Sequence, residues 1–405
     1  MRRRELLGGA AAVAAWGATR SFARARALRV GVVGGGIVGA SIALHLARAG
    51  AKVTLFEKAG PAQGATQNSF AWVNAFVPDT HYRSLRIESL LAYRELDRPL
   101  GLLMTWGGYV NWGATAAEAR TVQENAAQLA DTPYAVRTLN AAELAMLNPA
   151  LSPGEMSAAF FSAVDGHLDP VFVTRQFFAH AAAAGAALKF PCEVQGLTFR
   201  GARLAAVRTS RGEVAVDRLV VAAGVDTPRI LAMADFALAL KHAPGILAHS
   251  LPLAPLTPTI YDGPGGLSFK QMMDGSVVGT DAAEPPDTPV HQAIRKQAIP
   301  FPDEALRAQH GNRILSKIGV YLPAARGVGL QRLTLGFRPI PTDEMPVVGV
   351  LPNAPDVHVA VTHSGVTLAP ILGRLTRDEV LRGSRADILE PYRPERFSAV
   401  RPHPA

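Results

Sequence analysis

Three glycines near the start of the chain, Gly34, Gly36 and Gly39, have the spacing of a phosphate-binding turn. In such a turn the first glycine permits a tight bend, and the second lets a pyrophosphate approach the backbone. The third lets a helix pack closely on a strand. The N–H groups at the start of that helix would point at the phosphates. The spacing therefore predicts a dinucleotide site.

Glu57 supplies the second chemical group of this site. It lies 21 positions after Gly36, where an acidic residue is expected to meet a ribose hydroxyl. A carboxylate there would repel a 2′-phosphate, which disfavours NADP. The turn and the acid do not separate FAD from NAD, because both cofactors place an ADP group on this turn.

The segments around these residues have the pattern of a strand, a turn, a helix and a second strand. Residues 28–33 form an apolar run typical of a buried parallel strand. After the glycines, the sequence ASIALHLARAG predicts a helix that ends at Gly50. Residues 52–56 form the second strand. This context predicts a Rossmann-like α/β fold.

Further blocks, from about residue 29 to 397, follow an order that resembles the D-amino-acid oxidase, glycine oxidase and sarcosine oxidase family. They include GPAQGATQNSFAW (60–72), GHLDP (166–170) and GFRPIPTDEMPVVG (336–349), and the last matches the family's GxRPxxxDxxPxxG pattern. LEPYRPERF (389–397) resembles the closing segment of the family. The resemblance implies FAD as the cofactor.

The resemblance also assigns residues to the cofactor. The loop after the last long strand should bring the positive end of a helix to the flavin pyrimidine, which is anionic when reduced. This chain departs from the family at Phe70 and Thr362, where glycine is frequent. The assigned residues are Gly34, Gly36, Ile37, Val38, Gly39, Glu57, Lys58, Gly64, Ala65, Thr66, Asn68, Ser69, Val194, Ala223, Gly224, His363, Ser364, Gly365, Val366 and Thr367.

Three residues are candidates for chemistry on the substrate. By the resemblance, Arg338 stands where the family binds the substrate carboxylate, and a guanidinium fork suits that anion. Lys270 lies on a strand expected to face the flavin, where some relatives use a lysine near N5 to help oxygen react. Tyr261 is a candidate hydrogen-bond donor to the carboxylate, although glycine oxidase-like enzymes place a tyrosine nearer Ser268. A structural pair of Arg338 with Asp343 is the alternative.

The expected fold is α/β, with a discontinuous Rossmann-like FAD-binding domain and a substrate domain. Glycine and proline punctuate the short strands of the second domain, which predicts a mixed, mainly antiparallel sheet. The expected bounds are 28–80, 150–230 and 336–397 for the FAD-binding domain, 81–149 and 231–335 for the substrate domain, and 398–405 for a C-terminal tail.

Residues 1–27 have the order of a signal peptide: a basic start, a weakly apolar stretch and small residues. Arg3-Arg4-Glu5-Leu6-Leu7 resembles the twin-arginine export motif, and a disordered basic tail is the alternative. The twin-arginine route carries folded proteins, so it suits a protein that must trap FAD first. We expect a periplasmic or otherwise exported protein.

Composition excludes several other classes of protein. Residues 1–27 hold six arginines and one glutamate, so they account for five of the eight formal positive charges. No basic run with interleaved aromatics follows, which argues against a nucleic-acid partner. Cys192 is the only cysteine, so no intramolecular disulfide and no Cys/His zinc site are expected. No later segment predicts a membrane span, and no metal is expected.

The chain is therefore expected to be a FAD-dependent oxidase or dehydrogenase of an amino acid or amine. Its substrate would be a D-amino acid, glycine or an N-methyl amino acid, with hydride transfer to flavin N5 and hydrolysis of the imine. Oxygen, a quinone or a carrier protein would accept the electrons. A flavin monooxygenase is an alternative, although the sequence contains no second GxGxxG. An electron-transfer or scaffold subunit of a larger complex is another.

Overall fold

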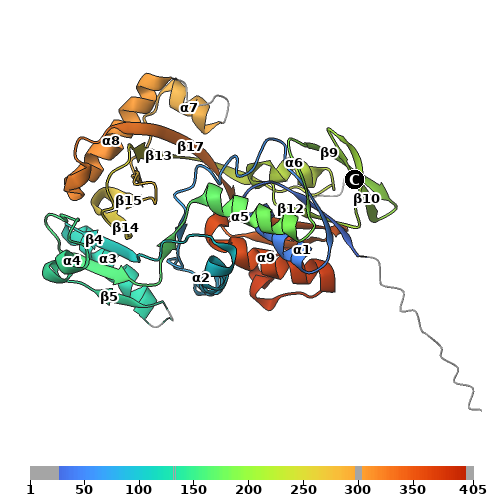
Figure 1. Ribbon diagram of the computed structural model, residues 1–405, viewed down its shortest axis with the longest axis horizontal. Coiled ribbons are helices and arrows are strands. Elements are labelled where there is room, and N and C mark those ends of the chain that lie inside the picture. The colour runs from blue at the N-terminus through green and yellow to red at the C-terminus, as the bar shows by residue number, and fades with distance from the viewer. Residues whose placement is uncertain (1–26, 131, 133, 297–302, 398–405) are drawn as a thin grey trace, which may run out of the picture.

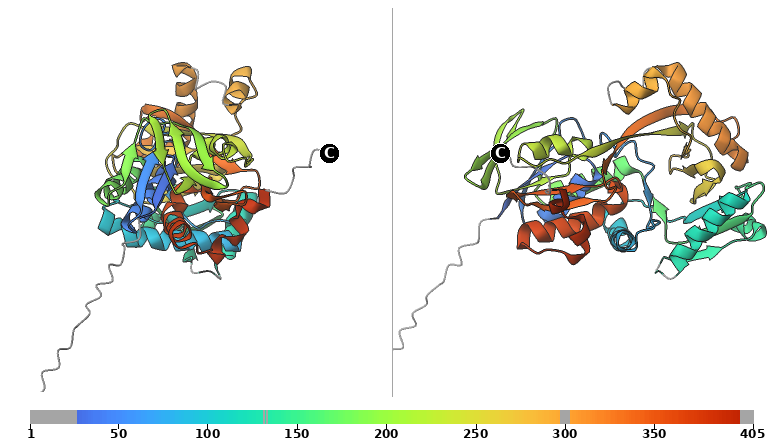
Figure 2. Two further views of the ribbon diagram at one scale, coloured as in Figure 1. Left: turned by 90° about the vertical axis from the view of Figure 1, so that its right-hand side faces the viewer. Right: turned by 180° about the vertical axis from the view of Figure 1, so that it is seen from behind.

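The computed structural model describes residues 27–130, 132, 134–296 and 303–397. The signal-peptide prediction, apart from Ala27, and the expected tail at 398–405 lie outside these residues. The described chain forms two domains that lie side by side along the long axis of the molecule (Figures 1 and 2).

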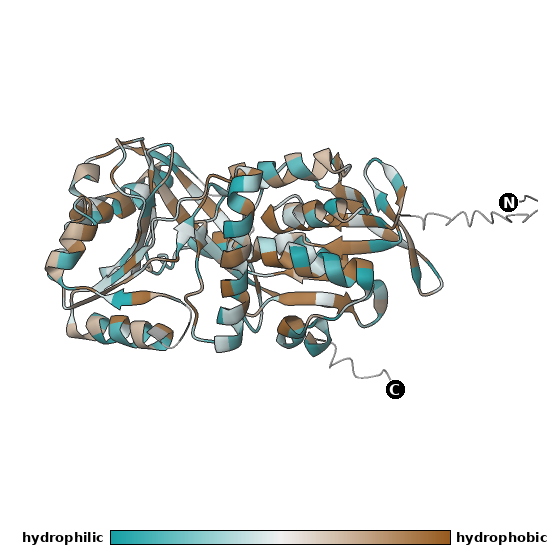
Figure 3. Ribbon diagram, turned by 60° about the horizontal axis from the view of Figure 1, so that its bottom comes forward, coloured by the Kyte–Doolittle hydropathy of each residue, from teal (hydrophilic) through white to brown (hydrophobic). Residues whose placement is uncertain are grey.

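The first domain is built on a six-stranded sheet in the order β18-β19-β12-β1-β2-β8. All neighbouring strands are parallel except β18 and β19. Except for β8 at the edge, its strands are mostly buried, and brown, hydrophobic segments run along several of them in Figure 3. The strands are β1 (Arg29–Val33), β2 (Lys52–Phe56), β8 (Ala187–Lys189), β12 (Arg218–Val221), β18 (Val347–Leu351) and β19 (Ala354–Val361).

Helices cover one face of this sheet and a small second sheet covers the other. Apolar side chains of α1 (Ile37–Arg48), α5 (Pro170–Ala183) and α9 (Gly365–Arg382) pack on the six strands. On the opposite face lies the antiparallel sheet of β9 (Val194–Arg200), β10 (Arg203–Thr209) and β11 (Gly212–Ala215). This three-layer arrangement is the expected Rossmann-like α/β domain.

The second domain contains an eight-stranded sheet in the order β17-β13-β16-β15-β14-β4-β6-β5. All pairs are antiparallel except β14 with β4, so the expected mixed, mainly antiparallel sheet is confirmed. The long strands β13 and β17 run toward the first domain (Figure 1). The strands are β4 (Tyr109–Gly113), β5 (Val136–Thr138), β6 (Ala158–Ser162), β13 (Leu240–Ser250), β14 (Ile260–Gly263), β15 (Leu267–Gln271), β16 (Val277–Thr280) and β17 (Leu330–Pro341).

The remaining elements are helices and short connections. Local sequence explains several of their ends. Asp79 caps the start of α2 by accepting a hydrogen bond from the Tyr82 N–H at 2.6 Å, and Gly101 ends it in the left-handed region. The elements are α2 (Thr80–Leu100), α3 (Ala116–Ala130), α4 (Ala141–Leu147), α6 (Thr227–Ala232), α7 (Pro289–Arg295), α8 (Glu304–Tyr321), β3 (Trp72–Val73), β7 (Gly166–His167), and the 3-10 turns η1 (Gly224–Asp226), η2 (Pro264–Gly266), η3 (Pro323–Ala325), η4 (Asp387–Tyr392) and η5 (Pro394–Phe397).

The two large sheets place several segments in a different domain from the one expected from the sequence. Helix α2, placed in the substrate domain by sequence, packs against α9 of the first domain. Strand β6 and the end of β17 lie in the eight-stranded sheet rather than in the FAD-binding domain. Between the two sheets the chain crosses after β8, which ends at Lys189, and β9 begins at Val194 in the other sheet.

Candidate active site

The glycine turn joins β1 to α1 at the carboxyl edge of the six-stranded sheet. Gly34 has a φ of +114°, and a Cβ there would overlap the Ala222 carbonyl. A Cβ on Gly39 would overlap the Gly34 carbonyl. The Ile37 N–H donates to the Thr66 hydroxyl at 3.2 Å, while Gly36 leaves the helix start without a side-chain cap. The turn therefore needs its glycines and leaves the helix N-terminus open to a ligand.

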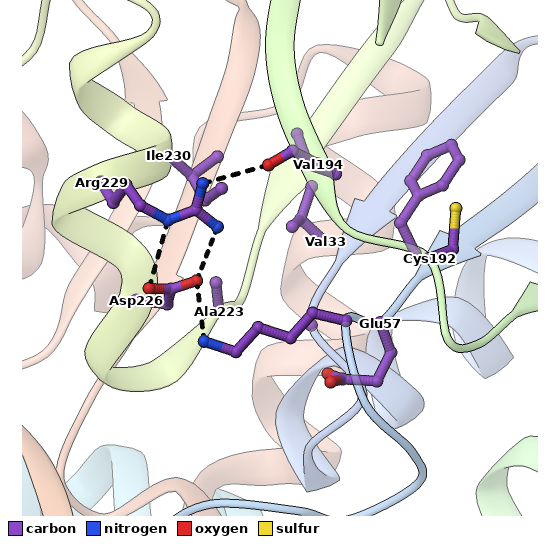
Figure 4. A pocket seen from close by; sticks show the side chains of 11 residues that line it. Val33, Glu57, Cys192, Val194, Ala223, Asp226, Arg229 and Ile230 are labelled. Carbon is purple, nitrogen blue, oxygen red and sulfur yellow. Dashed lines mark hydrogen bonds and ion pairs between the residues drawn. The ribbon is translucent and has the colours of Figure 1, made fainter. Parts of the chain in front are cut away.

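A pocket opens beside this turn (Figure 4). Its apolar walls include Val33, Val194 and Ile230, and Glu57 lies at its edge. The Glu57 carboxylate accepts hydrogen bonds from the Gly35 N–H at 2.7 Å and the Ala59 N–H at 2.8 Å. Predicted cofactor residues that line the pocket are Gly34, Glu57, Lys58, Val194 and Ala223.

Two further residues of this pocket were not predicted from the sequence. Arg229 forms an ion pair with Asp226 at 2.8 Å and donates to the Val194 carbonyl at 3.1 Å, as Figure 4 shows. Burial alone would raise the pKa of Asp226, but Arg229 and Lys58 outweigh it and lower that pKa. The signal was an Asp-x-x-Arg pair just after the Ala-Ala-Gly strand end. Cys192 is buried and lines the same pocket.

The 64–72 loop and the start of α9 meet the turn from two other directions. The Asn68 amide donates to the Gly64 carbonyl at 2.7 Å, which closes the loop on itself. A Cβ on Gly365 would lie 3.1 Å from a methyl of Val38, so α9 begins against the start of α1. The Thr367 hydroxyl donates to the Trp72 carbonyl at 3.1 Å and ties α9 to the loop. These contacts bring together the predicted segments at 34–39, 64–69 and 363–367.

Strand β17 approaches the same loop from the second domain. A Cβ on Gly336 would lie 2.5 Å from the Asn68 Cβ, so only glycine lets the strand come this near. Arg338 is two residues further on and faces the same side of the strand. Its side chain is exposed and forms no hydrogen bond or ion pair with another described residue. Asp343, the alternative partner, pairs instead with Arg396 at 2.7 Å.

Lys270 lies on β15 against the 64–72 loop. The side chain is 1% exposed, its ammonium donates to the Ala71 carbonyl at 3.3 Å, and it lies 5.1 Å from the centre of the Phe70 ring. Burial holds the pKa of Lys270 well below its usual value. The strand therefore presents this lysine to the loop that the resemblance assigns to the flavin.

The assignment of Tyr261 to the substrate is contradicted by its surroundings. Its side chain is fully buried, and its hydroxyl donates to the Asn148 side-chain oxygen at 2.8 Å and lies 2.7 Å from the Thr257 hydroxyl. Its ring stacks on Phe269 with centroids 4.9 Å apart. Tyr261 therefore belongs to the core between the eight-stranded sheet and α8, on the face opposite Lys270.

His363 lies where charges from both domains meet. Burial, followed by the charges of Arg86 and Arg338, lowers the pKa of His363 to about 4. The edge of its ring faces Tyr82 of α2 at 6.4 Å between centroids, and its Nδ1 lies 3.2 Å from the Ser364 hydroxyl. The imidazole is therefore neutral at neutral pH and carries no proton to give up as an acid.

A buried polar group beneath the 64–72 loop was also missed by sequence reasoning. Asp165 is fully buried and accepts hydrogen bonds from the Trp72 indole at 2.9 Å and from the Tyr134 hydroxyl. Burial raises the pKa of Asp165 to about 6, against those bonds. Burial and the nearby charge of Lys270 lower the pKa of His167 well below its usual value. Asp165 lies in the short connection between β6 and β7, where no periodic pattern marks it.

These residues fit the adenosine and pyrophosphate parts of FAD. The pocket has apolar walls for a flat ring and a carboxylate for a ribose, and the turn lacks the Cβ atoms that would block a phosphate. Lys270 and Arg338 approach the neighbouring loop from the other domain, and His363 precedes α9 in the first domain. The arrangement can bind a dinucleotide and present an anion-binding arginine beside it.

Comparison with known proteins agrees with this geometry. A profile of the family described as "FAD dependent oxidoreductase" matches residues 29–379. The human mitochondrial dimethylglycine dehydrogenase is 23% identical over 382 residues, which are 90% of this chain and 44% of that protein. This chain therefore spans less than half the length of that relative.

Solved structures share the fold over almost the whole chain. The L-proline dehydrogenase of P. horikoshii superposes with a TM-score of 0.80 at 22% identity, covering 92% of this chain and 98% of the other. The glycine oxidase of Geobacillus kaustophilus gives 0.79 at 22% identity, covering 90% and 98%. No described helix has the combination of length and apolar character needed to cross a membrane.

Proposed function

The chain belongs to the family of FAD-dependent oxidoreductases, and from this premise we propose that it oxidises the C–N bond of an amino acid or N-alkyl amino acid. FAD bound at the glycine turn would supply the chemistry by accepting a hydride from the carbon next to nitrogen; the resulting imine would be hydrolysed by water. The names of the similar proteins, which include a glycine oxidase and a dimethylglycine dehydrogenase, support this substrate class.

The cofactor would be held by the first domain alone. The Gly34–Gly39 turn would receive the pyrophosphate, and Glu57 would meet the ribose. The pocket between Val33, Val194 and Ile230 has the apolar walls that suit an adenine ring. The start of α9 would complete the site with its positive dipole end.

The protein's main contribution to the reaction would be to orient the substrate. The observation that carries this proposal is Arg338, which β17 brings to the 64–72 loop through the close approach of Gly336 to Asn68. Its guanidinium has no partner among the described residues, so it is available to bind a carboxylate with two parallel hydrogen bonds. A carboxylate held there would fix the position of the amine and the carbon next to it.

The test is a substrate screen with the FAD-loaded protein, using D-amino acids, glycine, N-methylated glycines and amines without a carboxylate. Each is measured with a dye acceptor and with oxygen. For the best amino acid, Arg338→Ala should lower kcat/KM by about a hundredfold, since losing a charged partner typically costs about 3 kcal/mol or more. Arg338→Lys should restore little, because a point charge does not reproduce the fork.

Arg332→Ala is the matched control, since Arg332 is an exposed arginine on the same strand. It should change kcat/KM little. Equal losses by Arg338→Ala on amines with and without a carboxylate would make Arg338 a structural residue. Wild-type activity only on amines without a carboxylate would remove amino acids from the proposal.

The proposal extends to the location of the protein and its electron acceptor. Residues 1–27 would direct export in the folded, FAD-loaded state, because Arg3-Arg4-Glu5-Leu6-Leu7 resembles the twin-arginine motif. Oxygen, a quinone or a carrier protein would take the electrons. Lys270, buried at the 64–72 loop, is the candidate residue for a reaction with oxygen.

A further inference from the structure

Two buried arginines lie one turn apart on α2 and have opposite surroundings. The Arg83 guanidinium donates four hydrogen bonds, to the carbonyls of Val77, Pro78 and Gln128, at 2.7–3.1 Å. Arg86 is 6% exposed, and its guanidinium donates no hydrogen bond to any other described residue. Its Nε is buried without a partner. Arg83 is therefore a structural residue, and the fold gives Arg86 no comparable role.

The described neighbours of Arg86 leave its N–H donors without acceptors. Its guanidinium lies 5.4 Å from the centre of the Tyr82 ring, and an aromatic face attracts a cation but does not satisfy its N–H donors. Asp165 is near enough for its charge to act on Arg86, yet the two form no ion pair. Trp72 and Tyr134 instead donate to one oxygen of Asp165, and the other oxygen is buried without a hydrogen-bond partner in the described part of the chain.

A buried guanidinium without acceptors is costly, and proteins keep one mainly where a ligand supplies them. Arg86 is always charged in practice, because guanidinium groups do not lose their proton. The cost of burying Arg86 therefore points to an anion that is absent from the described chain. A planar carboxylate matches the guanidinium fork better than a spherical ion does.

Arg86 and Arg338 both lie near His363. Arg86 faces the ring of Tyr82, and that ring lies 6.4 Å from the ring of His363 between centroids. The charges of both guanidinium groups reach His363 and lower its pKa. The two arginines come from different domains, Arg86 from α2 on the first and Arg338 from β17 on the second. A substrate with a single carboxylate, paired with Arg338, would leave the Arg86 guanidinium without an anion.

We propose that the substrate carries two carboxylates, one bound by Arg338 and the second by Arg86. The proposal rests on the proposed function and makes the substrate an amino dicarboxylate. The second carboxylate belongs either to the substituent on nitrogen, as in iminodiacetate, or to the side chain, as in glutamate. Both sources present the same anion to Arg86.

Binding of substrate-shaped anions tests this without turnover. Oxydiacetate has two carboxylates around an ether oxygen, and methoxyacetate has the same ether with one carboxylate. Isothermal calorimetry on the FAD-loaded wild type should give a Kd about tenfold or more lower for oxydiacetate. Arg86→Gln should bind the two anions about equally, and Arg98→Gln, which removes an exposed arginine from the same helix, should keep the preference. Arg86→Lys should keep part of the preference for oxydiacetate. If Arg86→Gln does not fold, the preference measured for Arg86→Lys tests the second carboxylate site instead.

The outcomes separate this inference from the proposed function. If the wild type binds both anions equally, or Arg86→Gln keeps the preference, the second carboxylate site is wrong. The proposed function still stands in that case if Arg338→Gln weakens both anions. If Arg338→Gln weakens neither anion, the role of Arg338 in the proposed function is wrong instead.

Turnover then identifies the source of the second carboxylate. The pair iminodiacetate and sarcosine tests a carboxylate on the nitrogen substituent, and the pair D-glutamate and D-norvaline tests one on the side chain. We expect one of the dicarboxylates to exceed its matched monocarboxylate in kcat/KM by about tenfold or more, and Arg86→Gln to remove that excess. A wild type that favours the monocarboxylate in both pairs would overturn the proposal.

Discussion

At the scale of single residues, Arg338 and Tyr261 show that a resemblance to a family assigns roles to residues without fixing the direction of their side chains. Both were assigned to the substrate, and both lie on strands of the same sheet. Strand β17 presents Arg338 to the 64–72 loop, while Tyr261 faces the core and stacks on Phe269. The side to which a strand residue points depends on register, since adjacent residues face opposite ways. A glycine- and proline-rich sequence does not fix that register.

Tyr261→Phe should therefore affect stability and leave catalysis unchanged. The substitution removes the shorter hydrogen bond to the Asn148 side-chain oxygen and leaves only that from Thr257 at 3.4 Å, which costs about 1 kcal/mol. Urea unfolding should show this loss, and kcat/KM should stay within about twofold of the wild type. A large fall in kcat/KM at unchanged stability would return Tyr261 to the substrate site.

Lys270 should give the protein a distinct dependence of stability on pH. Burial lowers the pKa of Lys270 in the folded state, so between that pKa and about 10.5 the unfolded chain binds the extra proton. Stability should rise with pH across this window. Lys270→Met lacks this proton, so it should be more stable than the wild type at neutral pH, with a margin that shrinks toward about pH 10.5.

Urea unfolding of the FAD-loaded proteins over a pH series measures this margin. Lys52→Met is the control, because Lys52 is exposed on β2, and its difference from the wild type should not vary with pH. A pH-independent margin for Lys270→Met would mean that Lys270 keeps its ordinary pKa in the folded protein.

At the scale of elements, the predictions were best where a strong local pattern coincided with burial. The β1–α1–β2 unit matches its expected position, since apolar runs and glycines mark its ends. Helix α8 was not predicted, although Asp303 caps it by accepting from the Leu306 N–H. Its sequence mixes charged residues with Gly311 and Gly319, so its apolar stripe is weak. Only packing on the eight-stranded sheet makes it a helix.

The C-terminal 3-10 turns are joined to α9 by a buried ion pair. Arg393 binds the two oxygens of Glu379 at 2.8 and 2.9 Å, and His358 and the Ala386 N–H also bond to that carboxylate. Arg393→Met should lower stability by about 3–5 kcal/mol, because it leaves a buried carboxylate without its partner. Arg385→Met breaks only exposed pairs and should cost less than about 1 kcal/mol.

Lowering the pH should reduce the difference in stability between the wild type and Arg393→Met. Burial alone would raise the pKa of Glu379, but hydrogen bonds from His358 and Arg393 outweigh it and lower that pKa to about 2. A depressed acid contributes its stability above its unfolded pKa and loses it as the pH falls. The gap in unfolding free energy between the wild type and Arg393→Met should narrow from about pH 4.5 toward 2. A constant gap would contradict a charged Glu379.

At the scale of the whole molecule, the sequence predicted two domains and a discontinuous first domain, but not where each segment changes domain. Helix α2 shows why. The sequence of α2 predicts an amphipathic helix but not which domain it packs on. Its place on α9 depends on contacts such as the hydrogen bond from the Tyr93 hydroxyl to the Val366 carbonyl at 2.6 Å. Arg86 was missed for the same reason, since only the packed helix reveals an arginine without acceptors.

The export proposal has a direct test on the full-length chain. Changing Arg3 and Arg4 to Lys should leave the precursor in the cytoplasm, because the twin-arginine route needs the arginine pair. Cell fractionation with an antibody against the mature protein measures this. Unchanged export of the double variant would argue for another route or for a simple basic tail.

The central claim is that this chain oxidises an amine bearing a carboxylate with its bound FAD. The most direct measurement is to mix the FAD-loaded protein with candidate substrates in the absence of oxygen and record the visible absorption of the flavin. At least one amino acid or N-alkyl amino acid should bleach the flavin, and Arg338→Ala should slow that bleaching by about a hundredfold. A flavin that dithionite reduces but no carboxylate-bearing amine bleaches would contradict the claim.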